Sequence, residues 1–258
     1  MPREVPKDHY RLSSDIKGKA KLYVIAAEGA KTEYNYFTTL RKEYDTKFNE
    51  KNVHVEILCR PSEHENHSSP KFVEKMLDDF LEDNQHYDFK EYDELWFIID
   101  TDSWKPAHIT EIAEKCQNAP LYHLGLSNPC FEIWLILHLV EPNAEIKTFC
   151  VADQQKKNAP LIKKCIEALE NNDNLDLSIK NCIEITKKEK RSHLCKQLLN
   201  LVREYYHVHS EDVSINKIPE AIQSAKQLDE CEPSSNNYPK NICTNVYKLV
   251  ETLTQQIE

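Results

Sequence analysis

Acidic residues follow two of the most hydrophobic stretches of the chain. The stretch 22–27 leads directly into Glu28. The stretch 95–99 leads into Asp100 and, two residues later, Asp102. Carboxylates that meet at one place repel one another unless a cation lies between them. Because Mg²⁺ and Mn²⁺ prefer oxygen ligands, these three side chains are the candidate ligands of a divalent metal site.

The elements around these acids predict how they could meet. A short apolar run that ends in polar residues is typical of a strand buried on both faces. Strands and helices are predicted to alternate, with strands at 21–27, 53–58, 95–99 and 120–124 and helices at 33–47, 70–83 and 106–117. This alternation predicts an α/β fold with a parallel, doubly wound sheet and right-handed crossovers. Ligands of such sheets bind outside the carboxyl ends of the strands, where the acids stand if their strands are neighbours.

The segment 127–140 is apolar at nearly every position after Pro129 and is predicted to form a buried helix. Ser127 or Asn128 can act as its N-cap, and Pro129 suits the first helical position. Glu132 then lies in the first turn, where the helix dipole favours an anion. A charge beside so apolar a helix is costly. We therefore expect Glu132 to be a fourth metal ligand or a general base, with a helix-terminus carboxylate as the alternative.

Five further polar residues near these elements are candidates for contacting a substrate: Lys31, Glu33, Lys105, Asn128 and His138. Each has an ordinary alternative role. The lysines suit solvated loops, the glutamate a capping box, the asparagine a helix cap, and the histidine a hydrogen-bonded place in the core. Thr32 is the expected N-cap of the helix at 33–47.

The chain is predicted to have three parts. Residues 1–20 form a flexible polar arm, 21–142 the metal-binding α/β domain, and 143–258 a helical region that packs on that domain. The helical region shows apolar faces at 3.6-residue spacing in four segments: 160–170, 192–207, 217–229 and 241–257.

Composition limits the partners and the compartment. The formal net charge is −10, so binding of nucleic acid requires a local basic patch, a bridging metal or a basic partner. No apolar run reaches the roughly 20 residues of a membrane helix, and the opening residues lack the apolar region of a signal peptide. Nine cysteines without a CxxC pair favour reduced thiols in a cytoplasm. The absence of Walker A, GxGxxG and GxSxG motifs argues against P-loop ATP hydrolysis, dinucleotide binding and α/β-hydrolase chemistry.

The order of these motifs resembles the TOPRIM domain of topoisomerases, primases and old-type nucleases, and more closely the RloB-like family. The resemblance rests on four segments in the expected order: 28–37, 98–102, 127–138 and 238–250. It implies a TOPRIM-like, metal-dependent nuclease of restriction and phage-defence loci, often encoded beside an ABC- or AAA-type ATPase. It further implies that Glu28 helps to hold the metal or serves as general acid/base, and that Asp100 and Asp102 bind the metal.

The predicted activity is Mg²⁺- or Mn²⁺-dependent cleavage of DNA or RNA, tRNA included. One alternative is a TOPRIM-like regulator or sensor of an ATPase that has lost turnover. A second is a small-molecule phosphatase, because a strand followed by Asp100-Thr101-Asp102 resembles the start of haloacid dehalogenases. Against that reading, the motif follows the third strand, and Trp104 stands where that family has Thr or Val.

Overall fold

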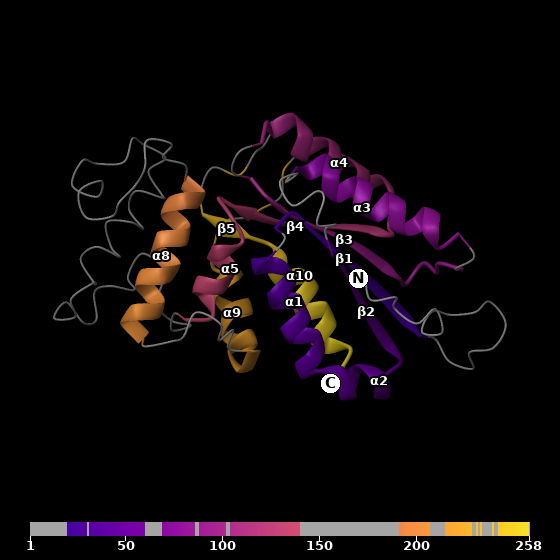
Figure 1. The fold of residues 1–258 in the computed structure, drawn as a ribbon, viewed down its shortest axis with the longest axis horizontal. Coiled ribbons are helices and arrows are strands. Elements are labelled where there is room, and N and C mark those ends of the chain that lie inside the picture. The colour runs from indigo at the N-terminus through magenta and orange to yellow at the C-terminus, as the bar shows by residue number, and fades with distance from the viewer. Residues whose placement is uncertain are drawn as a thin grey trace, which may run out of the picture.

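A five-stranded sheet forms the centre of the molecule, with the strand order β2-β1-β3-β4-β5 (Figure 1). The computed structural model describes residues 20–29, 31–59, 69–85, 88–101, 104–139, 191–206, 215–228, 231, 233, 239 and 242–257. The strands are β1 (Lys21–Ala27), β2 (Val53–Leu58), β3 (Glu94–Asp100), β4 (Tyr122–Asn128) and β5 (Cys243–Thr244). The first four run parallel, and β5 pairs antiparallel with β4. The predicted α/β class, of the Rossmann/TOPRIM-like type, is confirmed.

Helices cover both faces of the sheet (Figure 1). On one face lie α3 (Pro70–Asp83) and α4 (Pro106–Asn118), and on the other lie α1 (Thr32–Glu43), α2 (Asp45–Glu50) and α10 (Val246–Gln255). Three more helices and a 3-10 turn pack near the β4–β5 edge: α5 (Glu132–Leu137), α8 (Arg191–Tyr206), η3 (Ile215–Lys217) and α9 (Ile218–Ala225). The layout is a three-layer sandwich whose outer layers are helical.

The unbroken apolar runs are explained by burial on both faces of the sheet. Along a strand, successive side chains point to opposite faces. Tyr23 and Ile25 of β1 therefore join the core under α1, α5 and α10, while Leu22 and Val24 join the core under α3 and α4. Each such side chain contributes about 1.5–3 kcal/mol when it is fully buried.

Several boundaries differ from the sequence prediction. The helix expected at 33–47 is divided at Tyr44 into α1 and α2, and its N-cap is Lys31 rather than Thr32. The fourth strand runs to Asn128, four residues beyond the predicted end at 124.

The helix predicted over 127–140 is six residues long and begins only at Glu132. Ser127 and Asn128 do not cap it, because both belong to β4 and pair with β5. Pro129 follows a cis peptide bond and precedes the helix by three positions. The local pattern suggested a cap because it could not show that a strand about 115 residues later occupies the backbone of these two residues.

In the C-terminal half, α8 confirms the helix predicted at 192–207. The helix predicted at 217–229 is shorter, since α9 ends at Ala225, and the one predicted at 241–257 begins only at Val246, because Cys243 and Thr244 form β5. The short strand β5 was not predicted. The helix predicted at 160–170 and residues 1–19 of the predicted arm lie outside the described residues, and the division into three parts stays a prediction. Within the described part of the chain, no helix is both long and apolar enough to cross a bilayer.

Candidate metal centre

The two acid-ended strands lie side by side. β1 pairs with β3 in parallel, with Ala27 opposite Ile98. The backbone N–H of Glu28 continues this pairing by donating to the carbonyl oxygen of Ile98 at 2.9 Å. Glu28 therefore emerges next to Asp100, the last residue of β3, at the carboxyl edge of the sheet. This adjacency is the one on which the sequence prediction depended.

The Glu28 carboxylate is held by two hydrogen bonds from the β3 side. Its Oε2 accepts from the backbone N–H of Asp100 at 3.2 Å, and its Oε1 accepts from the indole N–H of Trp104 at 2.7 Å. The residue is buried, with 8% of its surface exposed. These bonds fix the orientation of the Glu28 carboxylate at the carboxyl edge of the sheet.

Glu33 is a second buried carboxylate at this edge, in the first turn of α1. It lies against the backbone of Gly29: a Cβ added to Gly29 would stand 1.8 Å from Glu33 Oε2. A glycine is therefore required for the Glu33 carboxylate to occupy this place. Burial, followed by the charges of Glu132 and Glu28, raises the pKa of Glu33 to about 7 against the pull of its own backbone N–H and of Lys196.

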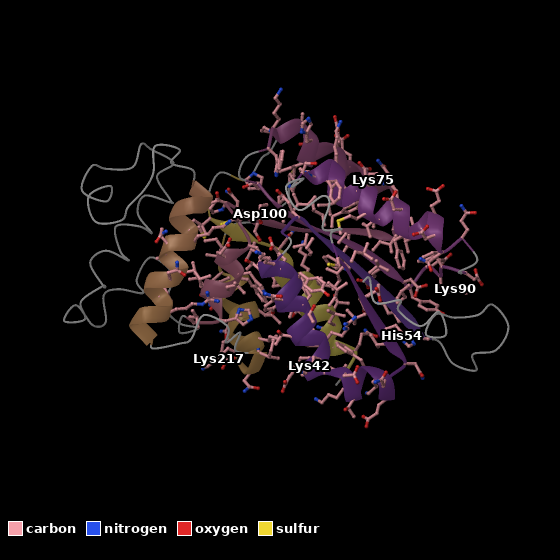
Figure 2. All side chains as sticks on the ribbon, in the orientation of Figure 1. Lys42, His54, Lys75, Lys90, Asp100 and Lys217 are labelled. Carbon is pink, nitrogen blue, oxygen red and sulfur yellow. The ribbon has the colours of Figure 1, made fainter. Side chains whose placement is uncertain are left out.

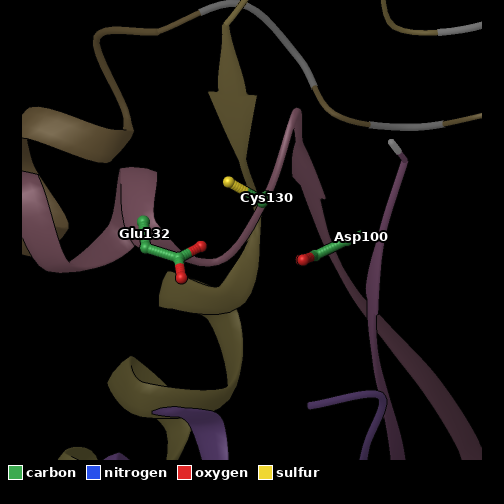
Figure 3. A group of neighbouring side chains, drawn as sticks. All are labelled: Asp100, Cys130 and Glu132. Atoms are coloured by element: carbon green, nitrogen blue, oxygen red, sulfur yellow. The ribbon is translucent and has the colours of Figure 1, made fainter. Parts of the chain in front are cut away.

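Asp100, Cys130 and Glu132 point into a common space (Figure 3). One donor atom from each lies within 4.8 Å of the others. Asp100 ends β3, Cys130 lies between β4 and α5, and Glu132 opens α5. The extension of β4 to Asn128 and the turn at Pro129 place the last two residues opposite β3. A carboxylate–thiol–carboxylate set of this size can hold a divalent cation.

The charges of this edge are far from balanced among the described residues. Burial, reinforced by Glu33, Glu28 and Glu132, raises the pKa of Asp100 well above its usual range. Buried carboxylates that lie this close together must either bind protons or bind a cation, because their negative charges repel one another. A bound divalent ion would replace those protons, so the donor chemistry fits the predicted metal.

One lysine from the C-terminal half reaches the cluster. Lys196 of α8 places its ammonium nitrogen 3.8 Å from Glu132 Oε1, with 57% of its side chain exposed. Burial alone would lower the pKa of Lys196, but its acidic neighbours, Glu132 first, raise that pKa overall. The apolar face of α8, which includes Cys195 and Leu199, packs in the same core as α5 and so positions this lysine.

Arg203 lies seven residues further along α8. Its Nε–H is buried and has no hydrogen-bond partner among the described residues. Burial lowers the pKa of Arg203, and the charge of Glu132 opposes that shift. Lys196 thus reaches the acidic cluster from a helix distant in sequence, and Arg203 of the same helix adds a positive charge that interacts with Glu132.

The other predicted residues lie in different settings. Lys31 and Lys105 are exposed residues that precede α1 and α4. Asn128 is buried; its Oδ1 accepts from the Thr101 hydroxyl at 2.7 Å and its Nδ2 donates to Pro239 O at 3.2 Å. These bonds connect β3, β4 and the C-terminal segment. Asp102 lies outside the described residues.

His138 is a core residue. Its Nδ1–H donates to the carbonyl of Trp134 at 2.9 Å, which leaves Nε2 to accept from the Tyr36 hydroxyl at 3.3 Å. Burial lowers the pKa of His138 to about 4, so the ring is neutral at pH 7. This arrangement agrees with the structural alternative for His138 rather than with substrate contact.

The sequence prediction did not include Cys130, Trp104 or Lys196 in the site. Cys130 stands two residues before Glu132, and this spacing was the signal that could have identified it. Trp104 was noted only as a departure from another family. Lys196 gave no local signal, because 64 residues separate it from Glu132.

A comparison of the sequence with known protein families finds a match. The family described as RloB-like protein matches residues 23–253, which is most of the chain. No curated protein and no solved structure shows significant similarity to the chain. The matched range contains β3, Glu132 and β5 in full and most of β1 and α10. The chain is a member of the RloB-like protein family.

Proposed function

We propose that the protein is a divalent-metal-dependent nuclease that hydrolyses phosphodiester bonds in DNA or RNA, with tRNA among the candidate substrates. The observation that carries the proposal is the convergence of Glu28, Glu33, Asp100 and Glu132 at the carboxyl edge of a parallel sheet. Neighbouring carboxylates of this kind bind the metal ions that nucleases use.

Asp100 and Glu132, together with Asp102 as predicted from the sequence, are the residues that would hold Mg²⁺ or Mn²⁺. A bound divalent ion would supply Lewis acidity, which offsets negative charge on a phosphate and makes a water molecule easier to deprotonate. Glu28 is oriented by Asp100 N–H and Trp104 and can serve as ligand or as general base. Glu33, whose pKa is raised to about 7, is suited to accept or return a proton near neutral pH.

The cationic Lys196 of α8 supports a phosphate substrate over a neutral one. Lys196 is partly exposed beside Glu132, so its ammonium group can contact both the carboxylates and a phosphate oxygen that approaches from solvent. Its position also offsets part of the repulsion between an acidic site and an anionic substrate. The overall charge of −10 remains unfavourable for nucleic acid, so we infer that a partner helps to capture the substrate.

An ATPase of the ABC or AAA type is the partner that we propose, in a system that acts against phage. This part of the proposal is supported by family membership and by the charge argument. It is tested by purifying the protein alone and together with a co-expressed ATPase of this type.

The deciding experiment measures cleavage of plasmid DNA, single-stranded RNA and tRNA with Mn²⁺ or Mg²⁺, with and without that partner. We expect cleavage that requires metal and is lost in Glu28→Gln and Asp100→Asn. The exposed carboxylate Asp79 offers the matched control, and Asp79→Asn should retain activity. If none of these substrates is cut with partner and Mn²⁺ present, the nuclease proposal is wrong. Hydrolysis of small phosphate esters alone would favour the phosphatase, and no hydrolysis at all would favour a regulator.

A further inference from the structure

Cys130 is the sulfur donor of the candidate metal centre. It is fully buried, and its Sγ stands within 4.8 Å of carboxylate oxygens of Asp100 and Glu132 (Figure 3). Among the described residues, the thiol has a long contact, 3.8 Å, to the carbonyl oxygen of Ser192 and a neighbouring thiol in Cys195. A sulfur that shares its space with two carboxylates is placed as a metal ligand would be.

We propose that Cys130 coordinates the metal directly, so that the centre binds a thiophilic divalent ion such as Zn²⁺, Co²⁺ or Cd²⁺ more tightly than Mg²⁺. The inference rests on the proposed metal centre and deepens it by naming a sulfur ligand. On binding, the metal–sulfur bond forms, the S–H bond breaks and the proton passes to water. No oxidant or reductant is involved.

The ligand types support this selectivity. Thiolates favour zinc and other soft or borderline ions, whereas Mg²⁺ takes oxygen ligands and gives up its water reluctantly. Zinc bonds are about 2.3 Å to sulfur and about 2.0–2.2 Å to oxygen. In a tetrahedral site such bonds place sulfur and oxygen donors roughly 3.5 Å apart, so the donors, now within 4.8 Å of one another, would approach by up to about 1 Å on binding. Three protein ligands leave a coordination position open, as in catalytic rather than structural zinc sites.

Comparison with a second buried thiol separates this role from ordinary packing. Cys231 is also buried and also has a thiol neighbour, Cys243. The other groups that act on its charge are Lys248 and the backbone of Asn128. The groups that act on Cys130 are Cys195, Glu132 and Asp100. The described residues thus include two similar thiol pairs, of which one lies among carboxylates, and Cys231→Ser is the matched control.

The test is a titration of the purified chain with Cd²⁺, monitored by the ultraviolet sulfur-to-cadmium charge-transfer absorption. Wild type and Cys231→Ser should show a band that saturates at one ion per chain, and Cys130→Ser should lack it. Cys130→Ser should also bind Cd²⁺ at least about tenfold more weakly and release about one proton fewer, while its Mg²⁺ affinity changes by less than about threefold.

A second variant keeps the sulfur and removes an oxygen ligand. Asp100→Asn should retain the band but require at least about tenfold more Cd²⁺ to reach it. A band of full strength in Cys130→Ser, or none in wild type, would overturn sulfur ligation. The band is measured without any substrate. If the band is absent but Mn²⁺-dependent cleavage is normal, only the assignment of Cys130 as a ligand is wrong. A band in a protein that cuts nothing would count against the nuclease proposal alone.

Discussion

The surroundings of the buried carboxylates differ between the amino ends and the carboxyl ends of the parallel strands. Lys90 and Asp100 mark these ends in Figure 2. At the amino end, Asp93 is 1% exposed, and its two oxygens accept from the backbone N–H groups of Leu22 and Lys90, each at 2.8 Å. Beside it, Lys21 and Glu94 form an ion pair at 2.7 Å. The carboxylates of this end are therefore matched by donors from the chain itself.

At the carboxyl end, the carboxylates interact mainly with one another. The charges of Glu28, Glu33 and Glu132 all raise the pKa of Asp100, and Lys196 only partly offsets them. Such an arrangement lowers the stability of the metal-free fold, whereas the arrangement at the amino end raises it. The difference indicates that one end of the sheet contributes to stability, whereas the other has a group of side chains that could hold a cation.

The largest effect is expected when one of the carboxylates at the carboxyl end of the sheet is removed. Asp100→Asn should lower Mn²⁺ affinity by at least about 100-fold, because a direct ligand is lost and ligand-supporting groups alone account for about 10–100-fold. The metal-free variant should be at least as stable as wild type, since one source of repulsion is gone. Calorimetric Mn²⁺ titration and thermal unfolding measure both effects, with Asp79→Asn as control. Unchanged Mn²⁺ affinity would mean that the carboxyl end is not a metal centre.

Removing a carboxylate at the amino end should instead lower the stability of the protein and leave its Mn²⁺ affinity unchanged. Asp93→Ala leaves one buried and one partly buried backbone N–H group without their acceptor and should destabilise the protein by roughly 2–3 kcal/mol. Its Mn²⁺ affinity, measured on the folded protein, should stay near that of wild type. Urea unfolding gives the loss of stability. A variant that unfolds at the wild-type urea concentration would remove the contrast between the two ends.

The pH dependence of stability should differ between the ends as well. The pKa of Glu33 is raised to about 7 in the folded protein, above its value in the unfolded chain. Between those two pKa values the folded state binds more protons, so this contribution is complete below the unfolded pKa and is lost as pH rises through about 7.

Metal-free wild type should therefore lose stability relative to Glu33→Gln between about pH 5 and pH 8, by up to roughly 3 kcal/mol. Added Mn²⁺ should restore the stability of wild type near pH 8, because the ion takes the place of the proton. Unfolding free energies of both proteins across this range provide the measurement. Parallel stability curves for the two proteins would show that Glu33 does not take up a proton on folding.

The sequence predicted the part of the site that lies on consecutive βα units. Strand ends at Glu28 and Asp100 follow from buried apolar runs, whereas their adjacency was a condition of the prediction that the pairing of β1 with β3 meets. Glu132 could be identified because a charge stands out in an apolar segment. These residues share one property, which is that local pattern and strand topology alone place them.

The parts that could not be predicted depend on contacts across the chain. The pairing of Ser127 with Thr244 decides that 127–128 is strand rather than helix cap, and it joins residues 117 positions apart. Lys196 enters the site only because α8 packs on α5. Cys130 was missed for a chemical reason, since a cysteine in an apolar segment usually serves as a small core residue.

Lys196 is expected to give the smallest effects and to separate two roles of its charge. Its side chain is 57% exposed, so solvent screens the ion pair with Glu132, and removing it changes metal binding only modestly. In Lys196→Met, Mn²⁺ affinity should rise by roughly two- to fivefold because a competing cation is gone, while KM for a nucleic acid substrate rises because a phosphate contact is lost. Lys217 forms a similar exposed pair with Glu220 at 3.7 Å, so Lys217→Met should change neither quantity. If Lys196→Met tightens metal binding without raising KM, Lys196 only offsets the negative charge of the carboxylates. Other groups at the carboxyl end of the sheet then contact the phosphate.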